Sequence, residues 1–148
     1  MIARAAADAS IQLRDTRYTH DPAVLAAQRR FVAINSAIEV DLFGAVNCET
    51  AAGRYVGAVG GATDFLRGAA RSEGGVPVIA LPSTAGAASR IVAALSGPAS
   101  QARADAGVIV TEYGIADLRG LTLSQRRKRM LAIAHPDHAE ALEKGRTP

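Results

Sequence analysis

The chain has 148 residues, 49% of them hydrophobic, 21% charged and only 4% aromatic, which is the composition of one ordinary globular domain. A formal charge of +3 without Trp does not indicate a nucleic-acid surface, which usually carries a basic stripe and stacking aromatics. The single cysteine, Cys48, excludes an internal disulfide and a Cys/His metal cluster and suits a reducing, cytoplasmic location, and no apolar run reaches the roughly 20 residues that span a membrane.

The first elements begin after an N-terminal segment, residues 1–17. This segment has an Ala run but also acidic residues, and it lacks the apolar core of a secretory signal. It predicts a short helix or a domain-boundary segment. Asp21 as N-cap and Pro22 at the first helical position then predict a helix that continues to about Arg30.

Two strand candidates follow that helix. Residues 31–35, FVAIN, are mostly apolar, and residues 38–42 alternate apolar and acidic side chains, the pattern of a half-buried strand with Glu39 and Asp41 outward. Gly44 marks a turn, and residues 45–50 continue as extended chain.

The remaining segments alternate between strand and helix patterns. We expect a helix at 61–72 and buried strands at 76–81 and 107–110. Between these strands, the apolar segment 89–95 fits either a strand or a helix, and residues 97–107 fit a loop. An amphipathic helix at 121–134, with Leu123, Met130, Leu131 and Ile133 on its apolar face, and a final helix at 135–145 complete the chain. Together these predict an α/β fold with an open, largely parallel sheet flanked by helices. No linker divides the chain, so we expect residues 1–148 to form a single domain.

Three segments fit the carboxyl ends of strands, where α/β sheets usually bind ligands: residues 57–61, 81–86 and 111–114. The first holds Gly57, Gly60 and Gly61, followed by Asp64. Its backbone N–H groups could bind an oxyanion or phosphate, helped by the helix that follows. The alternative is a tight turn with Asp64 as a helix cap. Glu112 is either a site carboxylate or an ordinary surface or salt-bridged residue.

The other reactive residue types have structural interpretations. Cys48 fits a buried small hydrophobe, and Ser83 lacks the G-x-S-x-G context of a nucleophile. The basic run 126–129 fits a solvated helix face. The three histidines, His20, His135 and His138, lie near helix starts and fit capping or surface roles. The sequence offers no catalytic triad, no metal-ligand set and no paired catalytic carboxylates.

Several segments, taken in order, carry a family resemblance. They are VNCET, VGAVGGATDFLRGAARSEGGVPVIALPSTAG, SRIV, VIVTEYGIADLRG and IAHPDH. In this order they resemble the C-terminal domain of the acetyl-CoA hydrolase/transferase family, which includes 4-hydroxybutyrate, butyryl and succinyl:acetate CoA-transferases. The resemblance covers about Tyr18 to Glu143. It implies a NagB/RpiA-like α/β domain that forms the C-terminal half of a longer enzyme.

The resemblance also implies a chemistry. Family members bind CoA between two similar α/β domains, and a glutamate attacks the acyl-CoA thioester to give acyl-anhydride and glutamyl-CoA intermediates. Gly57, Gly60, Gly61 and Asp64 match the family's loop at the thioester, where backbone N–H groups suit an oxyanion, and Glu112 matches a residue near it. The implied partners are acyl-CoA and carboxylate substrates, the N-terminal half of the enzyme and further copies in a homo-oligomer, with coenzyme A as substrate and no tightly bound cofactor.

This sequence departs from the family pattern in three respects. The family's nucleophilic glutamate belongs to a His-Ser-Glu-like segment upstream of these residues, so we assign no catalytic residue. Gly86 replaces a Lys that commonly helps to hold CoA, and His20 replaces an Asn that often precedes Asp-Pro. Two alternatives therefore stay open: a non-catalytic binding or interaction module that kept the fold, and a small enzyme that uses Glu112. The acyl group, the acceptor and the choice between hydrolysis and transfer also stay open.

Overall fold

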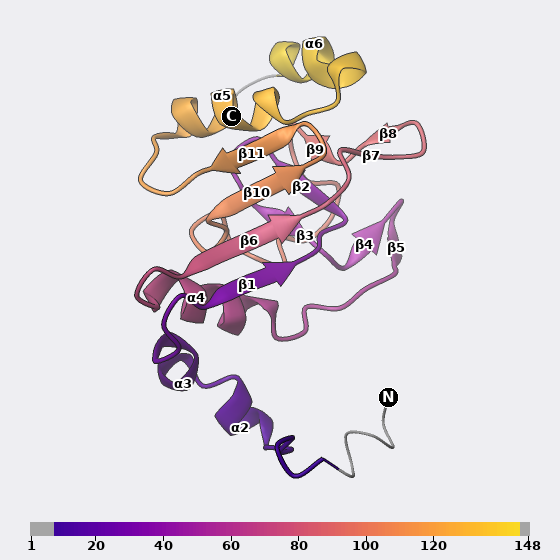
Figure 1. Ribbon diagram of the computed structural model, residues 1–148. Coiled ribbons are helices and arrows are strands. Elements are labelled where there is room, and N and C mark those ends of the chain that lie inside the picture. The colour runs from indigo at the N-terminus through magenta and orange to yellow at the C-terminus, as the bar shows by residue number, and fades with distance from the viewer. Residues whose placement is uncertain (1–7, 146–148) are drawn as a thin grey trace.

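A four-stranded sheet with the order β1-β6-β10-β11 organises the molecule (Figure 1). The computed structural model describes residues 8–145. Strands β1 (Val32–Asn35), β6 (Val76–Ala80) and β10 (Val108–Thr111) run parallel, and β11 (Gly114–Asp117) returns antiparallel beside β10. The largely parallel α/β fold expected from the sequence is confirmed, although β11 was not foreseen.

A smaller sheet lies behind the first and has the order β3-β2-β9 (Figure 1). Its strands are β2 (Glu39–Asp41), β3 (Val46–Asn47) and β9 (Ile91–Val92). Two short hairpins project from the sheets: β4 (Thr50–Ala51) with β5 (Arg54–Tyr55), and β7 (Thr84–Ala85) with β8 (Ala88–Ser89). The ambiguous segment 89–95 is therefore extended and not helical.

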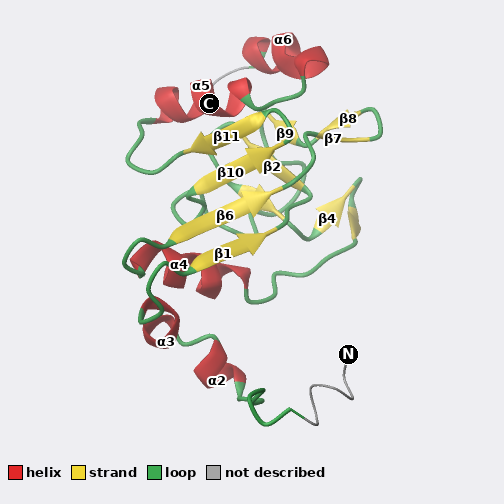
Figure 2. Ribbon diagram, viewed as in Figure 1, coloured by secondary structure: helices red, strands yellow, loops and turns green. Residues whose placement is uncertain are grey.

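The helices lie at the edges and behind the main sheet (Figure 2). They are α2 (Thr16–Thr19), α3 (Pro22–Ala26), α4 (Ala62–Arg71), α5 (Leu123–Ala132) and α6 (Pro136–Lys144). Asp21 caps α3 as expected by accepting a hydrogen bond from the N–H of Ala23, but α3 ends at Ala26 and not at about Arg30. Part of the predicted N-terminal segment, residues 1–7, lies outside the described residues. Of the described helices, none is long and apolar enough to cross a membrane.

One face of the main sheet forms the core. The register places Ala33, Ile79, Ile109 and Ala116 on this face, and all four are at most 5% exposed. Ile79, Ile109 and Ala116 belong to one cluster with Leu66 of α4 and with side chains of the smaller sheet. Because burying a large aliphatic side chain is worth about 1.5–3 kcal/mol, this cluster holds the two sheets and α4 together.

Glu39 corrects the simple alternation expected for β2. Val40 and Leu42 are buried as predicted, but Glu39 is also buried, at 8% exposure. Its Oε1 accepts hydrogen bonds from Asn47 Nδ2 at 2.9 Å and from the Ser96 N–H and Oγ at 2.7 and 2.9 Å. A buried carboxylate is tolerated when it is fully hydrogen-bonded. The acidic residue therefore joins β2, β3 and the segment after β9.

The basic run on α5 is only partly a solvated face. Arg126 donates from Nη1 to the carbonyls of Phe43 and Arg103 at 3.1 and 2.7 Å. Arg127 donates from Nη2 to two carbonyls at the end of α6, those of Leu142 and Glu143, at 3.1 and 2.6 Å. Both side chains thus tie α5 to other segments, whereas Lys128 and Arg129 are exposed as expected.

The apolar face predicted for the same helix is partly wrong. Met130 and Ile133 are buried, and Leu131 packs partly against the core. Leu123 is 50% exposed because it occupies the first turn of α5, just after the Thr122 cap, beyond the part of the helix that meets the core.

These contacts predict unequal effects within the basic run. Arg126→Ala should lower the free energy of unfolding by about 1–3 kcal/mol, because it removes charge-assisted hydrogen bonds and leaves two carbonyls without this donor. Lys128→Ala, on the same helix, should change it by less than about 0.5 kcal/mol. Urea unfolding of both variants measures the difference. Equal effects would mean that Arg126 is a solvated residue after all.

Candidate functional site

Ser83 and Glu112 join the carboxyl ends of two neighbouring parallel strands. Ser83 follows β6 and is fully buried, while Glu112 follows β10 and is exposed. The Glu112 carboxylate accepts from the Ser83 N–H at 2.8 Å and from the Ser83 hydroxyl at 2.6 Å. Two of the three predicted site segments, 81–86 and 111–114, therefore meet at one edge of the sheet. Among residues 8–145, Glu112 forms no salt bridge, and its exposed carboxylate is held in place by Ser83.

The same hydrogen bonds set the charge state of Glu112. The Ser83 hydroxyl, followed by the backbone N–H groups of Glu112 and Ser83, lowers the pKa of the Glu112 carboxyl below its usual range. Hydrogen bonds to the charged form favour ionisation. Glu112 is therefore a fixed, ionised carboxylate at neutral pH and accepts, but does not donate, hydrogen bonds.

The glycine loop, residues 57–61, occupies a different place from the one predicted. It does not follow a strand of the main sheet: it comes after β5, an exposed two-residue strand of the β4–β5 hairpin. It leads directly into α4, which begins after Gly61 as N-cap. Asp64 lies in the first turn of α4 and is not the cap, so the capping alternative for this residue is wrong.

The three glycines of the loop have different surroundings. Gly60 has φ +56°, a left-handed conformation that most residues avoid. A Cβ on Gly57 would lie 2.2 Å from the Cys48 carbonyl oxygen, so only glycine fits there. A Cβ on Gly61 would lie 2.3 Å from Nε2 of His20, because the imidazole ring covers this part of the loop.

The loop offers four consecutive backbone donors. Gly57 uses its N–H on the Glu49 carbonyl at 3.0 Å. The N–H groups of Ala58, Val59, Gly60 and Gly61, by contrast, donate no hydrogen bond to any acceptor among residues 8–145. Unpartnered N–H groups ahead of a helix N-terminus suit an anionic oxygen.

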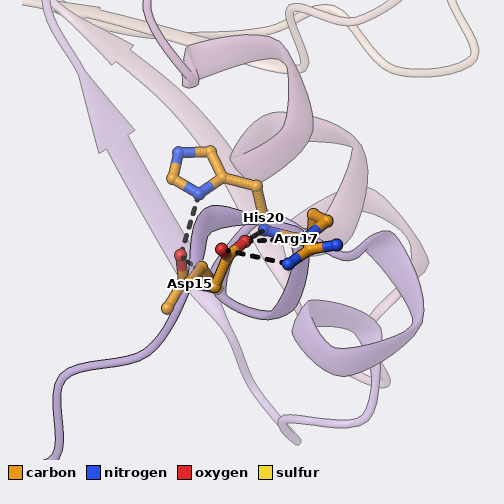
Figure 3. A network of polar contacts seen from close by, with 4 residues as sticks. Asp15, Arg17 and His20 are labelled. Atoms are coloured by element: carbon orange, nitrogen blue, oxygen red, sulfur yellow. Dashed lines mark hydrogen bonds and ion pairs between the residues drawn. The ribbon is translucent and has the colours of Figure 1, made fainter.

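A cavity of about 590 Å³ opens beside this loop. Gly60, Gly61 and Asp64 line one side, and residues of α2 and α3, among them Arg17 and His20, line the other. His20 packs edge-on against the Phe65 ring, and its Nδ1 lies 3.0 Å from Thr19 Oγ1. Arg17 is engaged by Asp15, which also caps α2 (Figure 3). His20, interpreted from the sequence as a capping or surface residue, is the C-cap of α2, is half-buried and also lines this cavity.

A second cavity, of about 480 Å³, lies at the edge of the sheet where Glu112 is found. Its lining includes Ala80 and Leu81 from the end of β6 and Val110, Thr111 and Glu112 from the end of β10. The described structure thus places Glu112 and the glycine loop in separate cavities.

Cys48 is half-buried and not fully buried, so its interpretation as a buried small hydrophobe is only partly met. Its Sγ lies 3.5 Å from the Ala58 carbonyl oxygen of the glycine loop and 3.4 Å from Gln101 Nε2.

The other two histidines, His135 and His138, lie near Glu112 and away from the glycine loop. His135 caps α6 as predicted, since its Nδ1 accepts from the Asp137 N–H at 3.2 Å. Its ring packs edge-on against Tyr113, next to Glu112, and His138 follows at 5.9 Å. Tyr113 was not singled out from the sequence, and its position in the TEYG segment is the only signal that could have done so.

Comparison with known proteins decides the family. Residues 1–145 match the family described as the acetyl-CoA hydrolase/transferase C-terminal domain. The chain belongs to this family. The resemblance seen in the sequence is confirmed.

Named relatives of the acetyl-CoA hydrolase/transferase family support the assignment. The 4-hydroxybutyrate coenzyme A transferase of Clostridium kluyveri is 42% identical over 129 residues, which is 84% of this chain and 30% of that protein. The succinyl-CoA:acetate/propanoyl-CoA:succinate CoA transferase of Fasciola hepatica is 43% identical over 90% of this chain and 29% of that protein. The acetyl-CoA hydrolase of Kluyveromyces lactis is 32% identical over 75% of this chain and 22% of that protein.

Solved structures agree with this assignment. RipA from Yersinia pestis superposes with a TM-score of 0.78 at 39% identity, covering 86% of this chain and 28% of that one. The 4-hydroxybutyrate CoA-transferase from Porphyromonas gingivalis gives a TM-score of 0.71 at 44% identity, covering 86% and 29%. The chain therefore spans about 30% of the length of the CoA-transferases named here.

The Ser83–Glu112 pair makes a prediction about pH. Ser83→Ala should raise the pKa of Glu112 toward its ordinary value, because the hydroxyl is the largest cause of the shift. The lowered pKa stabilises the fold at pH values above that of the unfolded carboxyl, about 4.3, and this stabilisation is lost as pH falls through the folded-state pKa. The destabilisation caused by Ser83→Ala should therefore shrink in acid.

Carbon-13 NMR titration of the glutamate carboxyls measures the pKa, and urea unfolding across pH measures the stability. Ser89→Ala is the matched control, because it removes a hydroxyl that donates to the Ile91 carbonyl and not to a carboxylate. If the Glu112 titration is unchanged in Ser83→Ala, the pair does not set its charge.

Proposed function

We propose that this chain is the C-terminal part of an enzyme that transfers coenzyme A between acyl-CoA and carboxylate substrates, and that loop 57–61 binds the thioester oxygen. The relatives named as CoA-transferases are 38–43% identical to the chain, against 32% for those named acetyl-CoA hydrolases, which favours transfer over hydrolysis. Their names point to acetate, butyrate, succinate and 4-hydroxybutyrate as the class of acyl group.

The free N–H groups of residues 58–61 carry this proposal. When a nucleophile adds to a thioester carbonyl, negative charge develops on its oxygen, and fixed N–H donors about 3 Å away stabilise that charge. Gly60 and Gly61 of the loop line a cavity wide enough for a ligand, just ahead of the α4 N-terminus, whose dipole favours negative charge. Gly57 contributes by close packing, since its own N–H is already used.

The two carboxylates take different roles in the proposal. Asp64 lines the loop cavity in the first turn of α4, where the helix dipole favours a carboxylate, and it offers an acceptor to donor groups of the substrate. Glu112 is held ionised by Ser83 and orients donors of the substrate, such as hydroxyl or amide groups. The attacking glutamate comes from another part of the full-length protein.

The non-catalytic alternative rests on position 86. Gly86 lies in the turn of the β7–β8 hairpin with φ +59°, and a Cβ there would meet nothing within 4 Å. A hairpin tip without a basic side chain gives CoA no charge to bind there. A protein that kept the fold but lost this contact would bind CoA weakly and show no transfer.

Gly60→Asn tests the role of the loop. Asn tolerates positive φ, so the backbone can keep its conformation while the new side chain enters the space where the thioester would approach. In the full-length enzyme we expect kcat/KM for acetyl-CoA to fall roughly 10²-fold or more, as for loss of an oxyanion donor. Gly120→Asn is the matched control, because Gly120 also has positive φ and open space but lies in the turn before α5.

Steady-state rates and thermal unfolding of both variants give the answer. A Gly60→Asn enzyme that folds and keeps full activity would reduce the loop to a simple turn.

The source of the nucleophile has its own test. The 148-residue chain alone should release no CoA from acetyl-CoA in the presence of succinate, butyrate or 4-hydroxybutyrate, because covalent transfer requires an activated attacking group. A coupled assay for free CoA measures this. Turnover by the chain alone that disappears in Glu112→Gln would instead make Glu112 the nucleophile.

A further inference from the structure

The two residues that follow β3, Cys48 and Glu49, hold the beginning of the glycine loop. The Glu49 carbonyl oxygen accepts from the Gly57 N–H at 3.0 Å. The Cys48 carbonyl oxygen lies so close to Gly57 that a Cβ there would come within 2.2 Å of it. The Cys48 Sγ also lies 3.5 Å from the Ala58 carbonyl oxygen. The position of the free N–H groups at 58–61 therefore depends on where Cys48 and Glu49 lie.

One hydroxyl group, that of Ser100, binds both of these residues. Ser100 is half-buried in the loop between β9 and β10. Its Oγ accepts from the Cys48 N–H at 3.0 Å and donates to the Glu49 carboxylate at 2.8 Å. Among residues 8–145, no other group donates to that carboxylate. Because the hydroxyl holds a backbone group of Cys48 and the side chain of Glu49, it fixes the orientation of the two residues that meet the loop.

Gln101, the next residue, contacts the same place. Its backbone is paired with Val46 of β3 by two hydrogen bonds of 3.0 and 3.1 Å. Its Nε2 lies 3.4 Å from the Cys48 Sγ, whereas its Oε1 has no hydrogen-bond partner among residues 8–145, although the residue is only 1% exposed. A buried oxygen without a partner lowers the stability of a fold. Such local costs are expected beside functional sites, and this one lies where the amide meets the thiol.

We propose that Ser100 is a positioning residue for the thioester site: through Cys48 and Glu49 it holds loop 57–61 where the loop N–H groups meet the thioester oxygen. This inference rests on the proposed function, in which the loop binds that oxygen. Ser100 does not line the loop cavity, so it acts through the two residues that it binds. Donors that are fixed in advance need no reorganisation when charge develops, and a displacement of about 1 Å can lower turnover roughly 10²-fold.

Ser100→Ala in the full-length enzyme tests the effect on catalysis, with acetyl-CoA as donor and the best of succinate, butyrate and 4-hydroxybutyrate as acceptor. We expect kcat to fall about tenfold or more and KM for acetyl-CoA to change by less than about twofold. The reason is that the loop donors act on charge that forms only in the transition state. Ser100→Thr keeps the hydroxyl and should restore most of kcat.

Ser72→Ala is the matched control for the loss of a bridging hydroxyl. The Ser72 Oγ also accepts from a backbone N–H, that of Phe31, and donates to a second residue, at the Gln28 carbonyl. Ser72 is the C-cap of α4 and so lies at the opposite end of this helix from the loop. We expect Ser72→Ala to keep the native kcat at temperatures where it is folded.

Hydrogen exchange followed by mass spectrometry gives a readout that does not depend on activity. The amide hydrogens of Val56 and Gly57 both donate to the Glu49 carbonyl. They should exchange at least about tenfold faster in Ser100→Ala than in the native enzyme, and at the native rate in Ser72→Ala. Glu49→Ala removes the other partner of the hydroxyl and should act in the same direction. The double variant should lower kcat no further than the stronger single variant, because the two residues act as one unit.

The combined results separate this inference from the proposed function. Faster exchange at residues 56–57 together with a lower kcat that Ser100→Thr restores supports the proposal. Native exchange rates in Ser100→Ala overturn it, as does an equal loss of kcat in Ser100→Ala and Ser72→Ala. Faster exchange with a native kcat would show that Ser100 holds the loop and would reject the proposed role of the loop. If Ser100→Ala fails to fold, Glu49→Ala gives the same comparison.

Discussion

The parallel pairing of β6 with β10 is the constraint on which the rest of the structure depends. The register sets Val78 opposite Val108 and Ala80 opposite Val110, so both strands end at the same level. That level brings Ser83 to Glu112, although 29 positions separate them in the chain. The buried Ser83 needs acceptors for its N–H and hydroxyl, and the Glu112 carboxylate supplies both. The pair fixes a negative charge at the edge of the sheet without burying it.

The hydrophobic pattern of each strand explains which strands could be predicted from the sequence. Continuous apolar runs at 76–81 and 107–110 are strong signals, and both strands formed as expected. Strand β11 was missed because GIAD contains a glycine and an aspartate and reads like a turn, and its pairing with β10 decides its conformation. The Glu39 side chain was misplaced for a similar reason: alternation describes a sheet with one wet face, whereas β2 lies between other elements and its acid is satisfied by Asn47 and Ser96.

The candidate site was predictable in its parts but not in its arrangement. Glycine spacing indicated a loop where backbone comes close, and Gly57 fits this against the Cys48 carbonyl, whereas Gly60 supplies a positive φ and Gly61 lies under the His20 ring. The hairpin ahead of the loop has strands of two residues each, too short for any periodic signal. Long-range partners also leave no local trace. The residues next to His20 in the sequence do not indicate that its ring lies over Gly61. Likewise, the residues next to Arg126 do not indicate that it donates hydrogen bonds to distant carbonyls.

The two candidate cavities lie in different parts of the fold. The Glu112 cavity is lined by the ends of β6 and β10. The loop cavity lies beside His20, where the chain enters α4. The described residues therefore hold an ionised carboxylate in one place and a set of free N–H groups in another. A ligand that contacts both must extend from the α4 N-terminus to the edge of the main sheet, so it has to be long rather than compact.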